Sequence, residues 1–341
     1  MMSAEAPWNR YLHDKARRAG LDGFEALLEA HGMRPSEGRA LYRALTREAA
    51  SDPFSPLTPV TVQEAEDGQT IKALLKLHDG FEIETVLMQH HGRRNTVCVS
   101  SQAGCAYRCA FCATGQAGFS RHLTPSEILD QVLFFARHLA QRGEKVTNIV
   151  FMGMGEPFHN YAAVRDAIAM LCDQSGMSLA KRHVTVSTVG LVPEIRKFAR
   201  EPLSVNLAVS LHAPTDAIRT PLMPVNERYA LDELMSACAD YAAETGRRIF
   251  FEYLMLEGVN DGDAEAEALA ALMRLGDYHV NLIPYNTTPD TALQGSADER
   301  VRAFQAILSG HGIPTTVRQP MGRDIAAACG QLQAETQPRA K

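Results

Sequence analysis

The chain has 341 residues, of which 45% are hydrophobic and 22% are charged, and its formal net charge is -6. That length suffices for one sizeable α/β domain with a small accessory unit, and the charge argues against a surface coated in positive charge for nonspecific nucleic-acid binding. No stretch reaches the ~18 apolar residues of a membrane span, and no apolar run near the first residue resembles a signal peptide. We therefore expect a cytoplasmic protein without a membrane partner.

Helical periodicity characterises the first fifty residues. Apolar residues recur at spacings of three and four, and Gly and Pro separate the periodic stretches. This pattern predicts an N-terminal helical accessory domain over residues 1–55. The segment Ser51–Val60 contains three prolines in ten residues, which indicates a linker or a domain boundary.

A β-hairpin is predicted next. The runs Thr70–Leu77 and Phe81–Met88 flank an Asp-Gly pair, which is a strong hairpin signal, and we expect the linker and hairpin to occupy residues 56–92. Because side chains alternate along a strand, Glu82 and Glu84 lie on one face of the second run. Glutamates on a hairpin normally face solvent.

Three of the seven cysteines, Cys105, Cys109 and Cys112, form a C-x3-C-x2-C array. Thiolates bind iron–sulfur clusters, zinc and soft metals. A structural zinc site usually has paired C-x2-C ligands, of which no second pair follows here, and a disulfide framework is typical of short secreted chains. The array, with Phe111 before its third cysteine, resembles the signature of the radical S-adenosylmethionine (SAM) superfamily, in which three cysteines hold a [4Fe-4S] cluster and the fourth iron binds SAM.

From residue 96 onward, strand and helix patterns alternate. The expected strands are Thr96–Ser101, Asn148–Met152, His183–Thr188, Ser204–Leu211, Ile249–Met255 and Val280–Pro284. The expected helices are Ser126–Arg142, Tyr161–Cys172, Pro193–Ala199, Leu231–Thr245, Ala264–Leu275 and Ala297–Gly310. Repeated β/α units predict a parallel sheet. With the cysteine array after the first strand, the fold class resembles the partial (β/α)6 barrel of radical SAM enzymes, here over residues 93–320.

Small and polar residues follow four of the expected strands. They are Gly153, Gly155 and Glu156 in "MGMGEP", Ser187 and Thr188 in "VSTVG", Ser210 and His212 in "SLHAP", and Asn286 in "IPYN". In parallel folds the chemistry collects at the carboxyl ends of the strands, so these residues predict a ligand-binding rim. The two glycines would permit close approach of the backbone to a ligand; a tight turn with an incidental acid is the alternative for "MGMGEP".

Two more cysteines lie in unusual positions. Cys329 is flanked by small residues within the C-terminal loop and tail expected over residues 321–341, and Cys98 lies seven residues before the array. A buried structural cysteine is the ordinary interpretation. It suits Cys172 and Cys238, which lie in helical patterns, better than it suits the other two.

The ordered motifs "CVSSQAGCAYRCAFCATGQAGFSRHL", "MGMGEP", "VSTVG", "SLHAP", "IPYN" and "DIAAACGQL" resemble the RlmN/Cfr family of radical SAM RNA methyltransferases, and its RlmN branch in particular. The resemblance extends from the hairpin to residue 332. The RlmN branch methylates C2 of an adenine in 23S rRNA, and some members also methylate an adenine beside the tRNA anticodon. The Cfr branch methylates C8.

The resemblance implies a task for each unusual residue. One SAM would methylate Cys329, giving an S-methylcysteine intermediate, and a second would yield the radical that removes hydrogen from that methyl group. Glu84 would accept the base proton, and Cys98 would resolve the protein–RNA link through a transient disulfide with Cys329. The implied SAM-binding residues are Gly155, Glu156, Ser187, Ser210, Leu211, His212 and Asn286. The implied cofactors are thus one [4Fe-4S] cluster and two SAM per turnover.

The same resemblance implies 23S rRNA, and in some members tRNA, as partners, with a ferredoxin- or flavodoxin-type electron donor and a monomeric enzyme. Two basic pairs, Arg93/Arg94 and Lys181/Arg182, are our expected phosphate contacts. Arg323 stands where many relatives have an aspartate, which bears on the mobility of the Cys329 loop.

Three alternatives stay open. The first is a C8 methyltransferase that confers antibiotic resistance. The second is a radical SAM enzyme acting on a peptide or small molecule, for which Cys98 and Cys329 would be idle. The third is a noncatalytic cluster or zinc protein, which would not cleave SAM.

Overall fold

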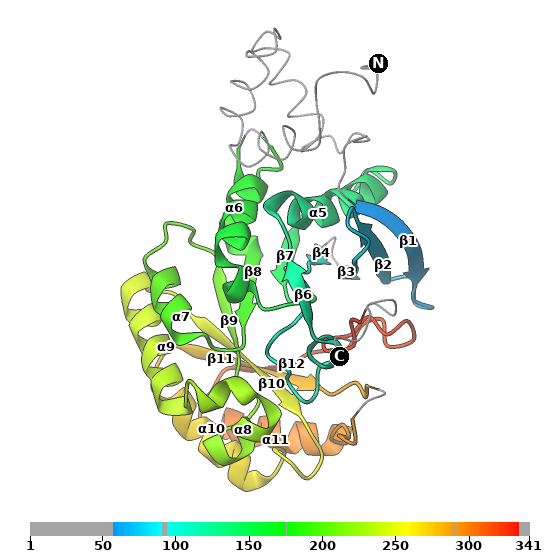
Figure 1. Cartoon of the computed structure of the whole chain (residues 1–341). Helices are drawn as coiled ribbons and strands as arrows, with labels where there is room; N and C mark the ends of the chain where they lie inside the picture. Colours follow the sequence, from blue (N-terminus) through cyan, green and yellow to red (C-terminus); the bar gives the residue numbers. More distant parts are fainter. Residues whose placement is uncertain (1–56, 91–93, 175, 289–290, 334–341) are drawn as a thin grey trace, which may run out of the picture.

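The computed structural model describes residues 57–333, except residues 91–93, 175 and 289–290. The predicted N-terminal helical domain and the C-terminal tail after residue 333 lie outside this part. Within it, one ten-stranded sheet has the strand order β1-β2-β3-β4-β7-β8-β9-β10-β11-β12, and it curves through the molecule in Figure 1.

The first four strands of this sheet are antiparallel and the rest are parallel. β1 (Leu57–Glu64), β2 (Thr70–Leu77), β3 (Glu82–His90) and β4 (Arg94–Cys98) pair in sequence. β4 then starts a parallel series with β7 (Asn148–Phe151), β8 (Val184–Thr188), β9 (Asn206–Ser210), β10 (Ile249–Met255), β11 (Tyr278–Pro284) and β12 (Thr315–Val317). Parallel neighbours require crossovers, which the helices supply.

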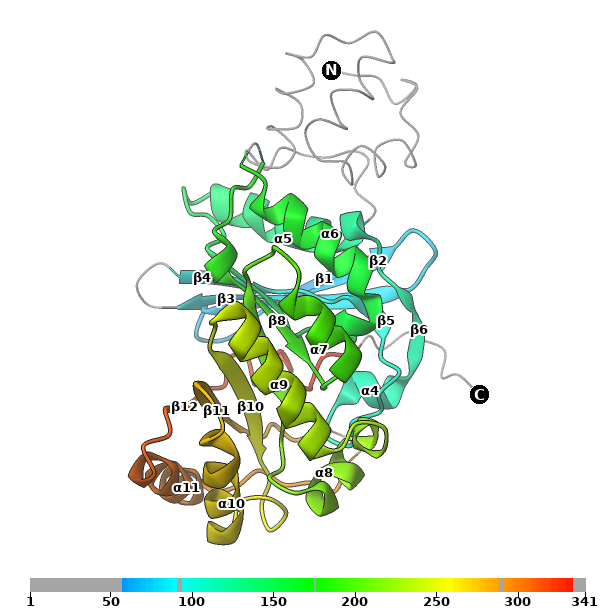
Figure 2. The same cartoon turned by 90° about the vertical axis from the view of Figure 1, so that its left-hand side faces the viewer.

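The helices cover the outer face of the parallel strands (Figure 2). They are α5 (Pro125–Ala140), α6 (Tyr161–Cys172), α7 (Val192–Ala199), α9 (Leu231–Thr245), α10 (Asp263–Met273) and α11 (Asp298–Gly310). α5 begins at a capping box, because the Thr124 side chain accepts from the backbone N–H of Glu127 and the Glu127 side chain accepts from the backbone N–H of Thr124. Short elements complete the described chain: β5 (Gln102–Gly104), α4 (Ala113–Ala117), β6 (Phe119–His122), η1 (Pro157–Asn160), η2 (Lys181–His183), α8 (Asp216–Leu222) and η3 (Pro224–Glu227).

Alternation along the strands separates an apolar outer face from a polar inner face. In β11, Val280 and Leu282 belong to the core beneath the helices, whereas His279 and Asn281 line a cavity inside the curved sheet. Because successive side chains point to opposite faces, the same rule places Glu252 of β10 inside. The interior is therefore a chamber and not a packed apolar core.

Most of the predicted elements are confirmed. β2, β10, α6 and α9 have the predicted bounds, and the other predicted strands and helices of the barrel differ by one to three residues at an end. The linker prediction for Ser51–Val60 is wrong from Leu57 onward, because β1 begins there and pairs with β2. Prolines are tolerated in β1 since it is an edge strand.

The hairpin is not a separate attachment: β3 pairs directly with β4 and continues the barrel sheet. The expectation that hairpin glutamates face solvent is also wrong, because Glu82 and Glu84 are 7% and 5% exposed. No helix in the described ranges is long and apolar enough to cross a membrane.

Candidate active site

The cysteine array lies in a loop between β5 and α4 that backbone contacts hold in place. Cys105 donates its N–H to the carbonyl of Gly118, and Ala110 donates to Leu222, at 2.8 and 2.9 Å. Gly104 has a φ of 76°, and a Cβ there would lie 1.9 Å from the Gly118 oxygen. Only glycine can occupy this position without moving the loop.

All three cysteines of the array line one cavity of about 140 Å³ at the carboxyl ends of the parallel strands. Burial raises the pKa of the Cys105 thiol to about 12 and the pKa of Cys109 well above its ordinary value, and the neighbouring thiols raise both further. A bound metal reverses this effect, because its positive charge deprotonates a coordinating thiol. Three thiols from one loop around one cavity are a donor set that suits an iron–sulfur cluster.

The donor set of a single metal ion is a separate question from that of a cluster. Among the residues that the structure describes, no group of three or more His, Cys, Asp or Glu side chains is arranged to hold one metal ion.

Glu156 supplies a buried carboxylate to the same cavity. Its two oxygens accept from the backbone N–H groups of Phe158 and Val189 at 2.9 and 2.8 Å, and the residue is 2% exposed. Burial raises the pKa of Glu156 to about 7, although these N–H groups oppose the shift. No cation of the described residues forms an ion pair with this carboxylate, and an ammonium group of a ligand would provide one.

The glycines of "MGMGEP" line the cysteine cavity, and their lack of a side chain also serves packing within the protein. A Cβ on Gly155 would lie 2.5 Å from Cβ of Gln102, and one on Gly153 would lie 2.8 Å from the carbonyl of Val99. The glycines therefore approach the chain after β4 closely, and their predicted close approach to a ligand stays a prediction. This packing brings Glu156 next to the cysteine loop, and Gln102 accepts from its backbone N–H at 2.8 Å.

His212 closes another side of the cavity in a strained conformation. Its φ is 57°, in the left-handed region that residues with a side chain rarely occupy. Nδ1 accepts from the N–H of Leu254 at 3.0 Å, the ring packs edge-on against Phe111 with centroids 4.7 Å apart, and burial lowers the pKa of His212 to about 3. The imidazole is therefore neutral and carries its proton on Nε2.

The remaining predicted SAM-binding residues divide into two groups. Ser187 and Ser210 line the cysteine cavity as expected. Leu211 is fully buried in the core, and Asn286 lines the neighbouring chamber, where its side-chain oxygen accepts from Nε of Arg323 at 2.6 Å. The structure does not bring these two side chains to the cysteine cavity.

The second cavity is the chamber inside the sheet, with a volume of about 830 Å³. Its lining mixes apolar side chains with many polar ones, and much of it comes from the inner face of the strands; it includes Arg94, Thr96, Cys98, Asn148, Thr185, Asn206, Glu252, Asn281, Arg318 and Cys329. Burial raises the pKa of Cys98, and the negative charge of the Cys329 thiolate raises it further. Both cysteines line this one chamber.

Cys329 lines both cavities and is accessible to solvent there. Its loop is bound to the cysteine array: Ala113 donates to the Gly330 carbonyl at 2.8 Å, and Thr114 donates to the Leu332 carbonyl at 2.5 Å. Figure 1 shows this C-terminal segment in red beside the cyan loop. Segments separated by more than two hundred residues thus form one site.

Comparison with known proteins agrees with this geometry. The sequence pattern of the Radical SAM superfamily matches residues 99–270. The chain is 46% identical over 335 residues to dual-specificity RNA methyltransferase RlmN 1 of Myxococcus xanthus, covering 93% of each chain. It is 50% identical over 300 residues to a probable RlmN of Chloroflexus aurantiacus, covering 85% of this chain and 80% of the relative.

The chain belongs to the RlmN family of radical SAM RNA methyltransferases. A solved radical SAM methyltransferase from Sphaerobacter thermophilus has the same fold, with a TM-score of 0.91 and 47% identity over 94% of this chain and 99% of that chain. The predicted family, fold class and enzyme class are confirmed. A radical SAM methyltransferase uses a [4Fe-4S] cluster and SAM, and the cysteine array and Glu156 are the groups of this RlmN chain that suit them.

Glu84 lies outside both cavities of this RlmN chain. Its Oε1 lies 2.9 Å from Nζ of Lys72, and its Oε2 accepts from the backbone N–H of Gln333 at 2.7 Å. The carboxylate therefore anchors the segment that follows Cys329. Its role as proton acceptor stays a prediction.

The expected phosphate contacts lie in different places. Arg94 is exposed and lines the chamber, and Arg93 is outside the described residues. Lys181 and Arg182 are exposed in η2, where Nζ of Lys181 donates to the Pro202 carbonyl at 3.1 Å.

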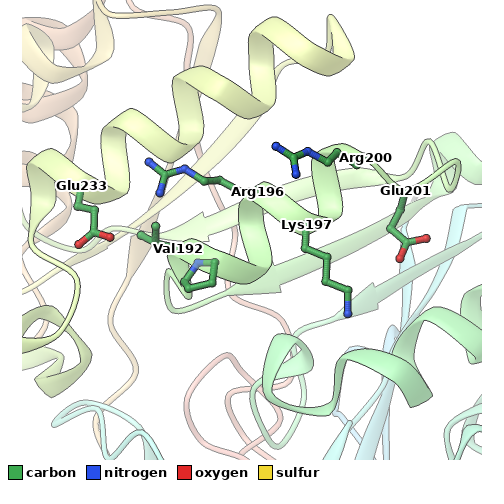
Figure 3. A pocket seen from close by; sticks show the side chains of 7 residues that line it. Val192, Arg196, Lys197, Arg200, Glu201 and Glu233 are labelled. Atoms are coloured by element: carbon green, nitrogen blue, oxygen red, sulfur yellow. The ribbon is translucent and has the colours of Figure 1, made fainter.

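A separate hollow on the outside of the barrel contains three cations, Arg196 and Lys197 of α7 and Arg200 just after it (Figure 3). Each has a partner: Arg196 lies 3.1 Å from Asp240, Arg200 lies 3.7 Å from Glu244, and Lys197 lies over the ring of Tyr161. These interactions describe a solvated, charge-balanced face.

Sequence reasoning missed Arg219, which is fully buried. Its guanidinium donates to the carbonyls of Val189, Ser210 and Leu211 and to the side chain of Asn226, at 2.7 to 3.1 Å. It thereby joins the ends of β8 and β9, which carry Ser187 and Ser210. Glu252 was also missed, and an acid within the apolar run of β10 was the available signal.

Proposed function

We propose that this enzyme methylates C2 of an adenine in 23S rRNA, and of an adenine beside the tRNA anticodon, through an S-methylcysteine on Cys329. The observation that carries this assignment is that Cys329 lines both cavities. One cavity contains the cysteine array and Glu156, and the other contains Cys98 among polar and apolar side chains. A thiol at their boundary can take a methyl group on one side and deliver it on the other.

The cysteine cavity suits SAM. Cys105, Cys109 and Cys112 would hold the cluster, the Glu156 carboxylate would bind the SAM ammonium group, and Ser187 and Ser210 would donate to its oxygens. When bound, the cluster and SAM supply the radical that removes a hydrogen atom from the methyl group of Cys329. The rigid placement of Glu156 and His212 orients SAM for that step.

In the chamber, the Cys329 methylene bonds to the base, and Cys98 then frees the product. Once the adduct radical has given up one electron, which the bound cluster would take back, and the C2 proton, the Cys98 thiolate attacks the Cys329 sulfur. The sulfur–methylene bond breaks with its electron pair moving to carbon, which takes up a proton to become the methyl group, and a disulfide forms. An external thiol reduces the disulfide. Partial dehydration by the surrounding protein raises the pKa of both thiols, and Arg318 opposes this rise for both, so Arg318 supports the thiolate forms.

A radical route explains why two cysteines are needed. C2 of adenine is not nucleophilic, so direct displacement on SAM would fail. Glu84 is our proposed acceptor of the C2 proton, which requires its carboxylate to leave Lys72 and Gln333. Cys98 and Cys329 would have no task in an enzyme that acts on a peptide or small molecule.

RNA would enter through the chamber side, where Arg94 provides a positive charge for a phosphate. The target base must leave its stack to reach the thiols, as for other enzymes that modify bases. A ferredoxin- or flavodoxin-type donor and a monomeric enzyme in the cytoplasm complete the proposal.

The test is anaerobic turnover of the reconstituted enzyme with labelled SAM, an unmodified 23S rRNA fragment and unmodified tRNA, followed by mass spectrometry of nucleosides. We expect 2-methyladenosine from the wild type and none from Cys329→Ala. 8-Methyladenosine would contradict the C2 assignment. Deoxyadenosine without methylated RNA would contradict the RNA substrate.

A further inference from the structure

Three side chains on adjacent strands form a hydrogen-bonded group inside the chamber. Glu252 of β10 lies opposite Asn281 of β11 in the sheet register, and Arg318 follows β12 directly. Nδ2 of Asn281 and Nη2 of Arg318 both donate to Oε1 of Glu252, at 2.9 and 3.0 Å. Because they share one acceptor atom, the amide and the guanidinium are immediate neighbours.

Glu252 determines how Asn281 is oriented. A carboxylate only accepts hydrogen bonds, so the amide nitrogen of Asn281 must face Glu252 and Oδ1 must point away from it. Oδ1 has no hydrogen-bond partner within the described ranges, and Asn281 lines the chamber although it is 7% exposed. The group thus presents a fixed acceptor to the chamber.

Arg318 presents donors beside this acceptor. Its backbone N–H donates to the Leu282 carbonyl, and one side-chain N–H donates to the Glu252 carboxylate. A guanidinium has five donors in a planar fork, and no other side-chain hydrogen bond of Arg318 occurs in the described part. The remaining N–H groups are therefore available to a ligand in the chamber.

The hydrogen bonding of the Glu252 carboxylate is incomplete within the described residues. Oε2 of Glu252 is buried and has no hydrogen-bond partner among the described residues. An unpaired buried carboxylate oxygen is costly, and such groups commonly mark a place where a ligand or water completes the network. Glu252 lines both cavities, next to Cys329.

We propose that Asn281 and Arg318, held by Glu252, recognise the target adenine: Asn281 Oδ1 accepts from the exocyclic amino group, and Arg318 donates to ring nitrogen N1. Adenine has this donor–acceptor order along its pairing edge, whereas guanine has the reverse, with an O6 acceptor and an N1–H donor. Guanine would therefore leave both protein groups unpaired. The assignment deepens, and rests on, the proposed RNA adenine methylation.

The same contact bears on the position of the methyl group. C2 of adenine is bonded to N1. An arginine bound at N1 therefore holds C2 toward the part of the chamber around Arg318, whose lining includes Cys329. Binding at N7 would instead present C8. Recognition through N1 thus supplies a physical reason for C2.

The test uses reconstituted enzyme and an RNA stem-loop whose target adenosine is replaced by purine riboside, which lacks the amino group, or by 1-deaza- or 7-deazaadenosine. Wild-type enzyme should lose about tenfold to hundredfold in kcat/KM and in RNA affinity with the purine and 1-deaza substrates. It should tolerate the 7-deaza substrate.

Variants assign the loss to residues. Asn281→Ala should be insensitive to removal of the amino group, and Arg318→Met should be insensitive to removal of N1. Asn206→Ala, which changes another asparagine of the same chamber, should discriminate like the wild type.

The outcomes separate the two proposals. Equal kcat/KM and equal RNA affinity of the wild type for the adenosine and purine riboside substrates would overturn recognition by Asn281. This outcome does not depend on the stability of the variants. Recognition by Asn281 would also be overturned if the loss in kcat/KM caused by Asn281→Ala and the loss caused by purine riboside simply added when variant and analogue are combined. Absence of methylation with every RNA would overturn the proposed function, while RNA affinities measured without SAM would still decide the recognition proposal.

Discussion

Nζ of Lys72 lies 2.9 Å from Oε1 of Glu84, and both side chains are at most one-tenth exposed. This buried pair joins β2 and β3 to the C-terminal loop, because Glu84 also accepts from Gln333 and Lys72 donates to the Ala326 carbonyl at 3.4 Å. The hairpin that looked like a linker in the sequence is therefore a support for the Cys329 loop.

Removing one partner of this pair should be strongly destabilising. Glu84→Ala leaves the Lys72 ammonium buried without compensation, and we expect a loss of about 3–5 kcal/mol in the free energy of unfolding by urea. Asp263→Ala breaks an exposed pair with Arg300 and should cost less than about 1 kcal/mol. Equal losses in the two variants would contradict the structural role of Glu84.

Glu156 should make stability depend on pH in the cluster-free protein. Its pKa is raised to about 7 in the fold from 4.5, so its protonated form is favoured and its contribution is fully present below pH 4.5. The contribution is lost as pH rises to 7, by roughly 3 kcal/mol. The difference in unfolding free energy between wild type and Glu156→Gln should fall by that amount between pH 4.5 and 8. A difference that does not vary with pH would show that the carboxyl group is not perturbed.

Arg219 should be needed for folding and not only for activity. Arg219→Met removes the donor from the carbonyls at the ends of β8 and β9, and each buried acceptor left unpaired costs about 1–3 kcal/mol. We expect a total loss of at least about 3 kcal/mol in urea unfolding. The matched control is Arg196→Met on the exposed face of Figure 3, which should change stability by less than about 1 kcal/mol.

Cys98 should act after the bond to RNA has formed. In Cys98→Ala, a covalent protein–RNA adduct should accumulate during turnover and be visible on a denaturing gel, because no thiol attacks Cys329. Cys238→Ala changes a fully buried cysteine of α9 and should release methylated RNA normally. Free 2-methyladenosine in RNA from Cys98→Ala at the wild-type rate would exclude the resolving role.

The sequence alone determined the order and nature of the elements. Period-2 and period-3.6 patterns, with caps and turn residues, depend on neighbours within one or two turns, which is why α6, α9 and β10 have the predicted bounds. The cysteine array and "MGMGEP" were equally visible, because a loop that holds a cluster and a strand end that holds a carboxylate are each encoded by consecutive residues.

Tertiary structure decided everything that depends on contacts distant in sequence. Only the folded chain shows that Glu84 is buried against Lys72, that the glycines pack on the chain after β4, and that Arg219 joins two strand ends. Cys329 is one cysteine among seven in the sequence, and it lies between two cavities because the C-terminal loop is hydrogen-bonded to Ala113 and Thr114 beside the cysteine array. Burial and partners are properties of the packed molecule, and no local pattern carries them.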